Sequence, residues 1–356
     1  MKKMLLAIGV ITLLIAFAVT GCRIGEEEKH KFTEDRIEEV RKDIWADLSE
    51  AKVGVCIYRF SDNYMTLFRR EIESYLVGLG FTKENIMIVD SADSEVVQDR
   101  QVRAFIDQGV DALIINPVDP SDVSGITNLA VEADIPLIYI NREPEADEEV
   151  RWEDNQWNVS YVGCDARQSG TIQGKIIADL GIENIDLNGD GVIQYIIVEG
   201  DPGNADTQYR SEYCIKALDD AGLQSECVFK GYADWEREKA EELVSEALKG
   251  GVEAEVIFCN NDAMALGTLS AVEKAGMRAG KDIKIVGVDA LTDVLIAVQE
   301  GQIAGTVFNN YIQQSHSAVD ALITYLSNET NPHYIGCDYV AVTPSNVQTI
   351  IESLAR

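Results

Sequence analysis

The chain has 356 residues, a formal net charge of −31 and 46% apolar residues. This length corresponds to about two domains of roughly 150 residues each, and the apolar content is sufficient for a core in both. The excess of acidic residues would repel the phosphates of nucleic acids and of anionic lipid surfaces. We therefore predict no nucleic-acid partner.

The first residues have the organisation of an export signal. Two lysines precede an apolar run over residues 4–19, which is short for a membrane-spanning helix. The run leads into the sequence VTGC at residues 19–22, which resembles a bacterial lipobox. We expect a signal peptide over residues 1–21 and lipid attachment to Cys22 after cleavage. The mature protein would then be extracytoplasmic and anchored to the cell membrane as a lipoprotein.

A highly charged segment follows over residues 22–50. Four apolar side chains recur in it at helical spacing: Ile37, Val40, Ile44 and Leu48. We predict a partly helical tether that holds the folded body away from the membrane.

Six further cysteines occur in the mature chain: Cys56, Cys164, Cys214, Cys227, Cys259 and Cys337. An even number outside the cytoplasm is compatible with disulfides. However, Cys56 and Cys259 lie in apolar, strand-like runs, where free thiols act as small hydrophobic side chains. We expect mostly free thiols, and Cys214 with Cys227 is the one pairing left open.

From Val53 onward, short apolar runs alternate with segments of helical pattern. The strand-like runs are VGVCIYRF, IMIVD, ALIIN, IPLIYIN, YIIVEG, VIFCNND, IKIVGVD and AGTVFNN. Helical patterns lie between them, for example around residues 94–108 and 121–133. This alternation is typical of an α/β fold with parallel sheets covered on both faces. An acidic segment over residues 143–158 interrupts the pattern, and we predict a surface loop there.

Polar side chains follow most of the predicted strands. The strand ends carry Asp62–Asn63, Asn116, Asn141–Arg142, Asn260–Asn261–Asp262, Asp289 and Asn309–Asn310. Ligands of open parallel sheets bind at the carboxyl ends of strands, and amides with carboxylates suit a neutral polyol. The chain has neither of the glycine-rich phosphate-binding motifs GxGxxG and GxxxxGK, so a nucleotide is not supported.

The stretch DLNGDGVIQ, residues 186–194, has the first half of a calcium loop. A loop of the EF-hand type needs a bidentate glutamate at its twelfth position, which is Ile197 here. The alternative is a turn rich in Asp and Asn, with Gly191 at positive φ. The loop alone therefore leaves the metal question open.

Several motifs together resemble one protein family. IYRFSDNYM, IYINREP, DLNGDGVIQ, DPGNADTQYR, NNDAMALG, VGVDAL and GTVFNN occur in this order. They resemble the bacterial galactose/glucose-binding proteins, a branch of the type I periplasmic solute-binding proteins. The resemblance extends from about Val53 to Ser353. It implies two doubly wound parallel-sheet lobes joined by three crossovers, near residues 163–165, 308 and 342–344. The first lobe would comprise residues 51–164 and 309–342, and the second residues 165–308 and 343–356.

The resemblance also implies a set of sugar-binding residues. They are Asp62, Tyr64, Asn141, Asn204, Asp206, Arg210, Trp235, Asn261, Asp289 and Asn309. Tyr64 and Trp235 would stack on the two faces of a pyranose, and Asp62 would accept from the hydroxyl at carbon four. Simpler alternatives are a packing role for Tyr64 and a surface ion pair for Asp206 with Arg210.

Two positions depart from the family pattern. Asn204 stands where the family has histidine, which affects the expected affinity and the ratio of galactose to glucose binding. Tyr64 stands where the family has phenylalanine, and we expect its additional hydroxyl at the rim of the site.

By the same resemblance, a distant glutamate would complete the calcium site. The implied ligands are Asp186, Asn188, Asp190, the carbonyl of Val192, Gln194 and Glu255. All are oxygen donors, as calcium requires. The ion would be structural, because the loop would lie outside the sugar cleft.

The function implied is capture of an aldohexose, D-galactose or D-glucose, for an ABC-type sugar permease. The protein is expected to be monomeric. The alternatives are another sugar such as ribose, or a sensor feeding a chemoreceptor or sensor kinase. An enzyme is not expected, because none of the three histidines falls at a strand end, although Asp62 with Asp289 would resemble a glycosidase pair. A repressor is not expected, because an export signal replaces the DNA-binding headpiece.

Overall fold

The computed structural model describes residues 48–355. The predicted signal peptide, the lipidation site at Cys22 and nearly all of the tether lie outside the described residues. The elements below belong to one compact unit that begins at Ala51. Within the described residues, none of the helices combines the length and apolarity needed to cross a bilayer.

The first sheet has six strands, all parallel to their neighbours, in the order β11-β5-β4-β3-β1-β2. Its strands are β1 (Val53–Ile57), β2 (Ile86–Asp90), β3 (Ala112–Ile115), β4 (Leu137–Ile140), β5 (Val159–Cys164) and β11 (Tyr334–Cys337). The order reverses on either side of β1, as in doubly wound folds. We call the part of the chain built on this sheet the first lobe.

The second sheet has four parallel strands in the order β7-β6-β8-β9. These are β6 (Ile193–Glu199), β7 (Ser225–Tyr232), β8 (Val256–Cys259) and β9 (Lys284–Val286). A separate antiparallel pair joins β10 (Thr306–Phe308) to β12 (Val340–Val342). We call the part built on the second sheet the second lobe. Two doubly wound parallel sheets confirm the predicted fold class.

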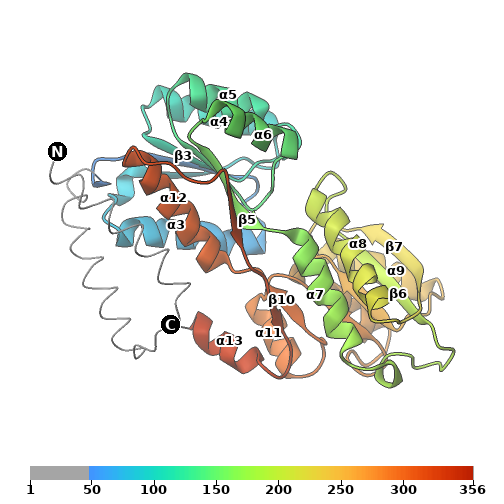
Figure 1. The fold of residues 1–356 in the computed structure, drawn as a ribbon. Coiled ribbons are helices and arrows are strands. Elements are labelled where there is room, and N and C mark those ends of the chain that lie inside the picture. Colours follow the sequence, from blue (N-terminus) through green and yellow to red (C-terminus); the bar gives the residue numbers. More distant parts are fainter. Residues whose placement is uncertain (1–47, 356) are drawn as a thin grey trace, which may run out of the picture. The chain divides into compact units, whose positions relative to one another are not determined.

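Helices cover both sheets, and the two lobes lie at opposite ends of the ribbon in Figure 1. The first lobe has α3 (Asn63–Gly78), α4 (Glu95–Asp107), α5 (Ser124–Glu132), α6 (Ala146–Asn155) and α12 (Tyr311–Leu326). The second has α7 (Ala166–Ala178), α8 (Ala205–Asp220), α9 (Arg237–Lys249), α10 (Asp262–Lys274), α11 (Thr292–Gln299) and α13 (Val347–Leu354). Two 3-10 turns, η1 (Lys83–Asn85) and η2 (Ile182–Asn184), lead towards β2 and β6. The chain passes between the lobes three times: from β5 to α7, from β10 to α12 and from β11 to β12.

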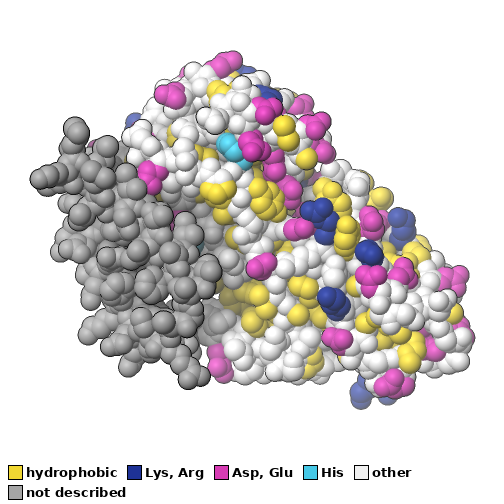
Figure 2. Space-filling model, in the orientation of Figure 1, with side chains coloured by type: hydrophobic (Ala, Val, Ile, Leu, Met, Phe, Trp, Pro, Cys, Tyr) yellow, Lys and Arg dark blue, Asp and Glu magenta, His cyan; other side chains and the backbone are white. Residues whose placement is uncertain are grey.

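Burial along each strand follows its place in the sheet. The central strands β1, β3, β4, β5 and β8 are buried at every residue, because helices cover both faces. The edge strands β2 and β7 are largely half-buried or exposed. Each lobe has its own apolar cluster, which includes Phe105 and Tyr139 in the first lobe and Met264 and Leu295 in the second. Acidic side chains are spread over the visible face in Figure 2, in keeping with the net charge.

The acidic segment at 143–158 differs from the prediction, because it contains helix α6. Trp152 is fully buried in this helix and stacks on Tyr139 of β4, with ring centroids 5.4 Å apart. Its indole nitrogen donates to the Glu148 carboxylate at 2.9 Å. Three acidic residues lie in the first turn, where they interact favourably with the helix dipole. The aromatic anchor and the favourable charges explain a helix where composition alone suggested a loop.

The six cysteines that the structure describes all have free thiols. Cys227 is exposed and the others are buried. The pairing of Cys214 with Cys227, left open by the sequence, is not formed here. Burial raises the pKa of the Cys56 thiol to about 12, which makes this side chain an unreactive part of the first-lobe core.

The contact between α7 and α8 generates a stability prediction. A Cβ atom at Gly174 would lie 2.2 Å from the carbonyl oxygen of Cys214 and 2.6 Å from the Cβ of Ala217. Gly174→Ala should therefore lower the free energy of unfolding by about 1–3 kcal/mol, because the helices must move apart. Urea denaturation would measure this change.

The matched control is Gly125→Ala in α5, where a Cβ atom meets nothing within 4 Å. This variant should be neutral or more stable by up to about 1 kcal/mol, since alanine favours the helix. Equal destabilisation by both variants would contradict the close packing of α7 on α8.

Candidate functional site

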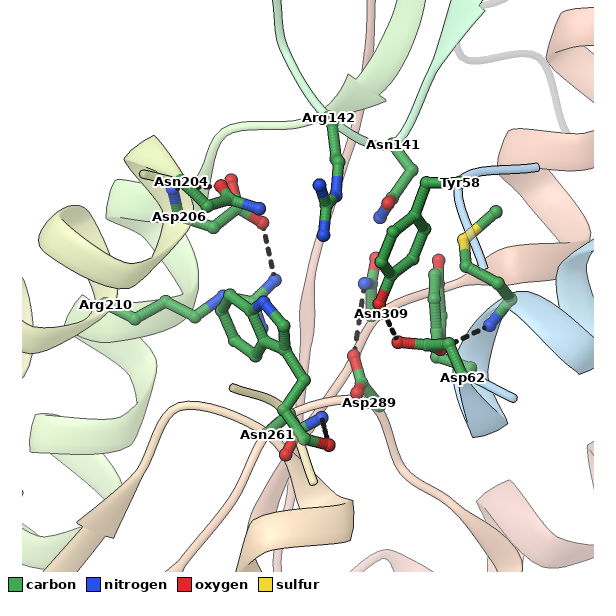
Figure 3. Close-up of a pocket in the computed structure, with 13 residues that line it drawn as sticks. Tyr58, Asp62, Asn141, Arg142, Asn204, Asp206, Arg210, Asn261, Asp289 and Asn309 are labelled. Atoms are coloured by element: carbon green, nitrogen blue, oxygen red, sulfur yellow. Dashed lines mark hydrogen bonds and ion pairs between the residues drawn. The ribbon is translucent and has the colours of Figure 1, made fainter. Parts of the chain in front are cut away.

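The strand ends of both lobes meet at one cleft. Thirteen residues line it: Tyr58, Asp62, Tyr64, Met65, Asn141, Arg142, Asn204, Asp206, Arg210, Trp235, Asn261, Asp289 and Asn309. All ten predicted sugar-binding residues are among them. The cleft encloses about 350 Å³, including space that is open to solvent. Figure 3 shows their side chains converging from the two lobes.

Three cleft residues also begin helices. Asp62, Asn204 and Asn261 are the N-caps of α3, α8 and α10, and each accepts from a backbone N–H of its helix. A helix N-terminus carries a partial positive charge, which favours oxygen-rich groups nearby. The same local sequence therefore ends the loop, starts the helix and presents a polar group to the cleft.

The Asp206–Arg210 pair lies at one turn's spacing on α8. An Asp206 carboxylate oxygen lies 2.8 Å from the guanidinium, and their side chains are 13% and 4% exposed. Arg210 also donates to the Asn260 carbonyl at 2.7 Å and to the Tyr339 hydroxyl at 3.2 Å. Burial raises the pKa of Asp206, although Arg210 acts in the opposite direction. This pair is therefore buried in the cleft and is not the surface ion pair considered as the alternative.

Asp62 has both carboxylate oxygens engaged. One accepts from the Met65 N–H at 2.8 Å, and the other accepts from the Tyr58 hydroxyl at 2.6 Å. Arg142 places its guanidinium 3.7 Å from the centroid of the Tyr58 ring and donates to the Val118 carbonyl at 2.6 Å.

Three cleft residues, Tyr58, Met65 and Arg142, were not among the predicted sugar-binding residues. Tyr58 directly follows β1, Arg142 lies two residues after the end of β4, and Met65 lies in the first turn of α3. Position at a strand end was the signal for Tyr58 and for Arg142, which the sequence analysis noted there without assigning it to the site.

Asp289 is 4% exposed and accepts from the Asn309 amide at 3.2 Å. Burial raises its pKa well above the ordinary range; Asp262 and Asp62 add to the rise, and Arg210 opposes it. Its backbone φ is 122°, and the φ values of Asn141 and Trp235 are 65° and 66°. Non-glycine residues rarely adopt such conformations, which tend to collect at functional sites.

Trp235 enters the cleft from the loop after β7. Its ring lies directly over Gly200, where a Cβ atom would be 2.2 Å from the indole Cζ2. The Arg210 guanidinium lies 5.6 Å from its ring centroid. The indole Nε1 is buried and has no hydrogen-bond partner among the described residues.

Tyr64 differs from the prediction in the position of its hydroxyl. The residue is 5% exposed, and its hydroxyl accepts from the Gln314 side-chain amide at 2.9 Å. The expectation of a hydroxyl at the rim was therefore wrong. The ring packs edge-on against Phe68, with centroids 5.9 Å apart, so α3 and α12 hold the phenol inside the lobe.

The loop at 186–194 lies at the start of β6. Asp186 accepts from the backbone N–H groups of Gly189 at 2.7 Å and Gly191 at 2.8 Å. Gly191 has a φ of 83°. Gln194 donates to the Asp190 carboxylate at 3.0 Å. The carboxylate oxygens of Asp186 and Asp190 thus accept hydrogen bonds from groups within the loop itself.

Glu255 reaches this loop from the segment before β8. It is 5% exposed, and one carboxylate oxygen accepts from the N–H groups of Leu187 at 2.6 Å and Asn188 at 3.2 Å. Its other oxygen accepts from the Gln194 N–H at 3.3 Å. Across the described residues, no group of three or more His, Cys, Asp or Glu side chains is arranged to hold a metal ion. The donor set of carboxylate, amide and carbonyl oxygens nevertheless fits the chemistry of calcium.

Known proteins share this fold and much of this sequence. The chain is 36% identical over 275 residues to the D-galactose/methyl-galactoside binding periplasmic protein MglB of Haemophilus influenzae, covering 76% of this chain and 80% of that protein. It is 28% identical to the ribose import binding protein RbsB of Bacillus subtilis, covering 86% and 88%. An ABC transporter solute binding protein from Bacillus halodurans C-125, solved with bound myo-inositol, has a TM-score of 0.74 at 27% identity, covering 85% and 98%.

The match to a family is equally extensive. Residues 53–330 match the periplasmic binding protein domain. The matched range takes in every strand of the two sheets except β11, and all thirteen cleft residues described above. The chain therefore belongs to the periplasmic binding protein family of type I fold.

Proposed function

We propose that this protein is an extracytoplasmic lipoprotein that captures an aldohexose, D-galactose or D-glucose, between its lobes. It would deliver the sugar to an ABC-type permease. The observation that carries the proposal is the cleft itself, in which carboxylates, amides and three aromatic side chains converge. The relatives named for galactose and ribose support a sugar as the ligand class.

The charges in the cleft suit an uncharged ligand. Asp62, Asp206 and Asp289 are balanced in part by Arg142 and Arg210. Carboxylates accept hydrogen bonds from hydroxyls, and Asn side chains both donate and accept. A hexose offers both kinds of group around its ring, with apolar C–H faces for Trp235 and Tyr64. Closure of two lobes on such a ligand needs only tighter binding to the closed state.

The contacts of Asp62 favour binding over catalysis. A glycosidase would need one carboxyl group as an acid and a second as a nucleophile or base. Both oxygens of Asp62 are already engaged by Tyr58 and the Met65 N–H. Asp62 and Asp289 are better placed as fixed acceptors than as a catalytic pair.

The cellular setting is also part of the proposal. Lipidation of Cys22 would anchor a monomer outside the cell membrane, beside its permease. A role as a sensor for a chemoreceptor or sensor kinase is the alternative. A ribose-type sugar is the alternative ligand, because a relative carries that name.

Isothermal titration of the mature protein tests the ligand. We expect one-to-one binding of D-galactose or D-glucose, at least about tenfold tighter than that of D-ribose or myo-inositol. The reason is that one buried polar group left unpaired costs roughly a factor of ten. Tighter binding of ribose or inositol would contradict the aldohexose assignment.

Trp235 generates a second prediction. Trp235→Ala should weaken hexose binding by about 1–3 kcal/mol, the scale of a lost aromatic anchor. Gly200→Ala should also weaken it, because the added Cβ would displace the indole ring from its position in the cleft while Trp235 itself is kept. Titration calorimetry would measure both. Trp157→Ala is the control, since Trp157 packs on the first-lobe core outside the cleft; equal losses in all three variants would remove Trp235 from the binding site.

We further propose that a calcium ion is held by Asp186, Asn188, Asp190, the Val192 carbonyl, Gln194 and Glu255. The contacts of Glu255 with both ends of the loop support it. A bound ion would neutralise these carboxylates and join the loop to the segment that leads into β8.

Chelation tests this site. A chelator should lower the melting temperature and calcium should restore it, because the unfolded chain has no assembled site. Glu255→Gln should remove most of the restoration, while sugar affinity changes less. Glu253→Gln is the matched control, as Glu253 is exposed two residues earlier. A full calcium response in Glu255→Gln would show that this carboxylate is not a ligand.

A further inference from the structure

Gln314 lies behind the cleft in α12 and is 1% exposed. Its side-chain nitrogen donates to the Tyr64 hydroxyl at 2.9 Å and to the Asn309 side-chain oxygen at 2.6 Å. The Asn309 nitrogen then donates to the Asp289 carboxylate at 3.2 Å. These bonds form a chain from α3, through α12 and the end of β10, to Asp289 in the second lobe. Gln314 itself does not line the cleft.

The direction of this chain follows from the chemistry of its ends. A side-chain amide that turns over exchanges its donor for its acceptor. An Asp289 carboxylate oxygen accepts from the Asn309 side-chain nitrogen at 3.2 Å, so Asn309 directs its NH₂ group towards Asp289. The Asn309 oxygen then faces Gln314, which donates to it from its own NH₂ group. The second N–H of Gln314 is received by the Tyr64 hydroxyl.

We infer that Gln314 is a positioning residue that fixes the orientation of the Asn309 amide. The cleft thereby presents a donor from Asn309 next to an acceptor from Asp289. A sugar that places an accepting oxygen and a donating hydroxyl on neighbouring carbons would match this pair. The inference rests on the proposed function and assigns a discriminating role to a residue without a ligand contact.

The Tyr64 hydroxyl is part of the same chain of hydrogen bonds. Without it, one N–H of a nearly fully buried Gln314 would lose its acceptor, and the amide would be held less firmly. The hydroxyl would thus act on the ligand through Gln314 and Asn309. This distinguishes it from the aromatic ring of Tyr64, which would contact the sugar directly.

Two substitutions at Gln314 separate positioning from packing. Gln314→Glu places a carboxylate beside the Asn309 oxygen, so the amide should turn and direct its oxygen at Asp289. Gln314→Met keeps the length of the side chain but imposes no orientation. We expect D-galactose affinity to fall about 100-fold in Gln314→Glu and about tenfold in Gln314→Met, as for a reversed and a lost hydrogen bond. Calorimetry with D-galactose measures both, and equal losses would overturn the inference.

A double-mutant cycle tests the chain without a ligand. Asp289→Asn supplies a donor to the turned Asn309, so it should recover part of the melting temperature lost in Gln314→Glu. Gln314 has no direct hydrogen bond to Asp289, so coupling beyond the repulsion between the two carboxylates would have to pass through Asn309. Additive changes in the melting temperature would overturn the inference. Coupling in a protein that fails to bind any hexose would leave the chain established and refute the proposed function instead.

A second cycle applies if Gln314→Glu does not fold. Tyr64→Phe removes only the hydroxyl and should weaken D-galactose binding in the wild-type background. In the Gln314→Met background the same change should have no further effect, because the hydroxyl has lost its partner. Should the two losses add, Tyr64 acts independently of Gln314 and the inference fails. If no hexose binds, the melting temperature replaces the affinity as the measurement. Tyr64→Phe should then lower it in the wild-type background and leave it unchanged in the Gln314→Met background.

Discussion

Arg210 carries its positive charge into a site where 4% of its side chain is exposed, beside an Asp206 carboxylate that is 13% exposed. Charges this far from water are costly unless their hydrogen bonds are satisfied, so the surroundings must be arranged to receive them. The guanidinium contacts α8 through Asp206, the end of β8 through the Asn260 carbonyl and a crossover between the lobes through Tyr339. Arg210 therefore joins α8, the end of β8 and the segment between β11 and β12 through its hydrogen bonds.

Several polar groups of the cleft also have a structural role at the ends of strands and the starts of helices. Parallel strands bring their carboxyl ends together, and the helices that follow begin at those ends. Asp62, Asn204 and Asn261 satisfy a helix N–H and face the cleft at once. Because these caps are part of the fold, the site is organised before a ligand arrives. The left-handed conformations at Asn141, Trp235 and Asp289 show where the backbone departs from its preferred geometry to direct a side chain inward.

Much of this arrangement follows from local sequence, and the rest does not. Continuous apolar runs predicted the central strands, and a resemblance in short motifs identified the ten cleft residues that the structure brings together. Helix α6 was missed because it depends in part on a buried contact, between Trp152 and Tyr139, that composition cannot show. The depth of the Tyr64 hydroxyl was missed for a related reason: its partner, Gln314, lies 250 positions away in the chain. Hydrogen bonds between distant elements have no periodicity to reveal them.

A crystal structure of the mature protein grown with D-galactose would test the central claim most directly. The account predicts a pyranose between the lobes, with Trp235 against one face and neighbouring hydroxyl or ring oxygens within hydrogen-bonding distance of Asp289 and Asn309. Arg210 and Asp206 should keep their mutual contact in that complex. A ligand of another chemical class in the cleft, or galactose bound elsewhere on the molecule, would contradict it.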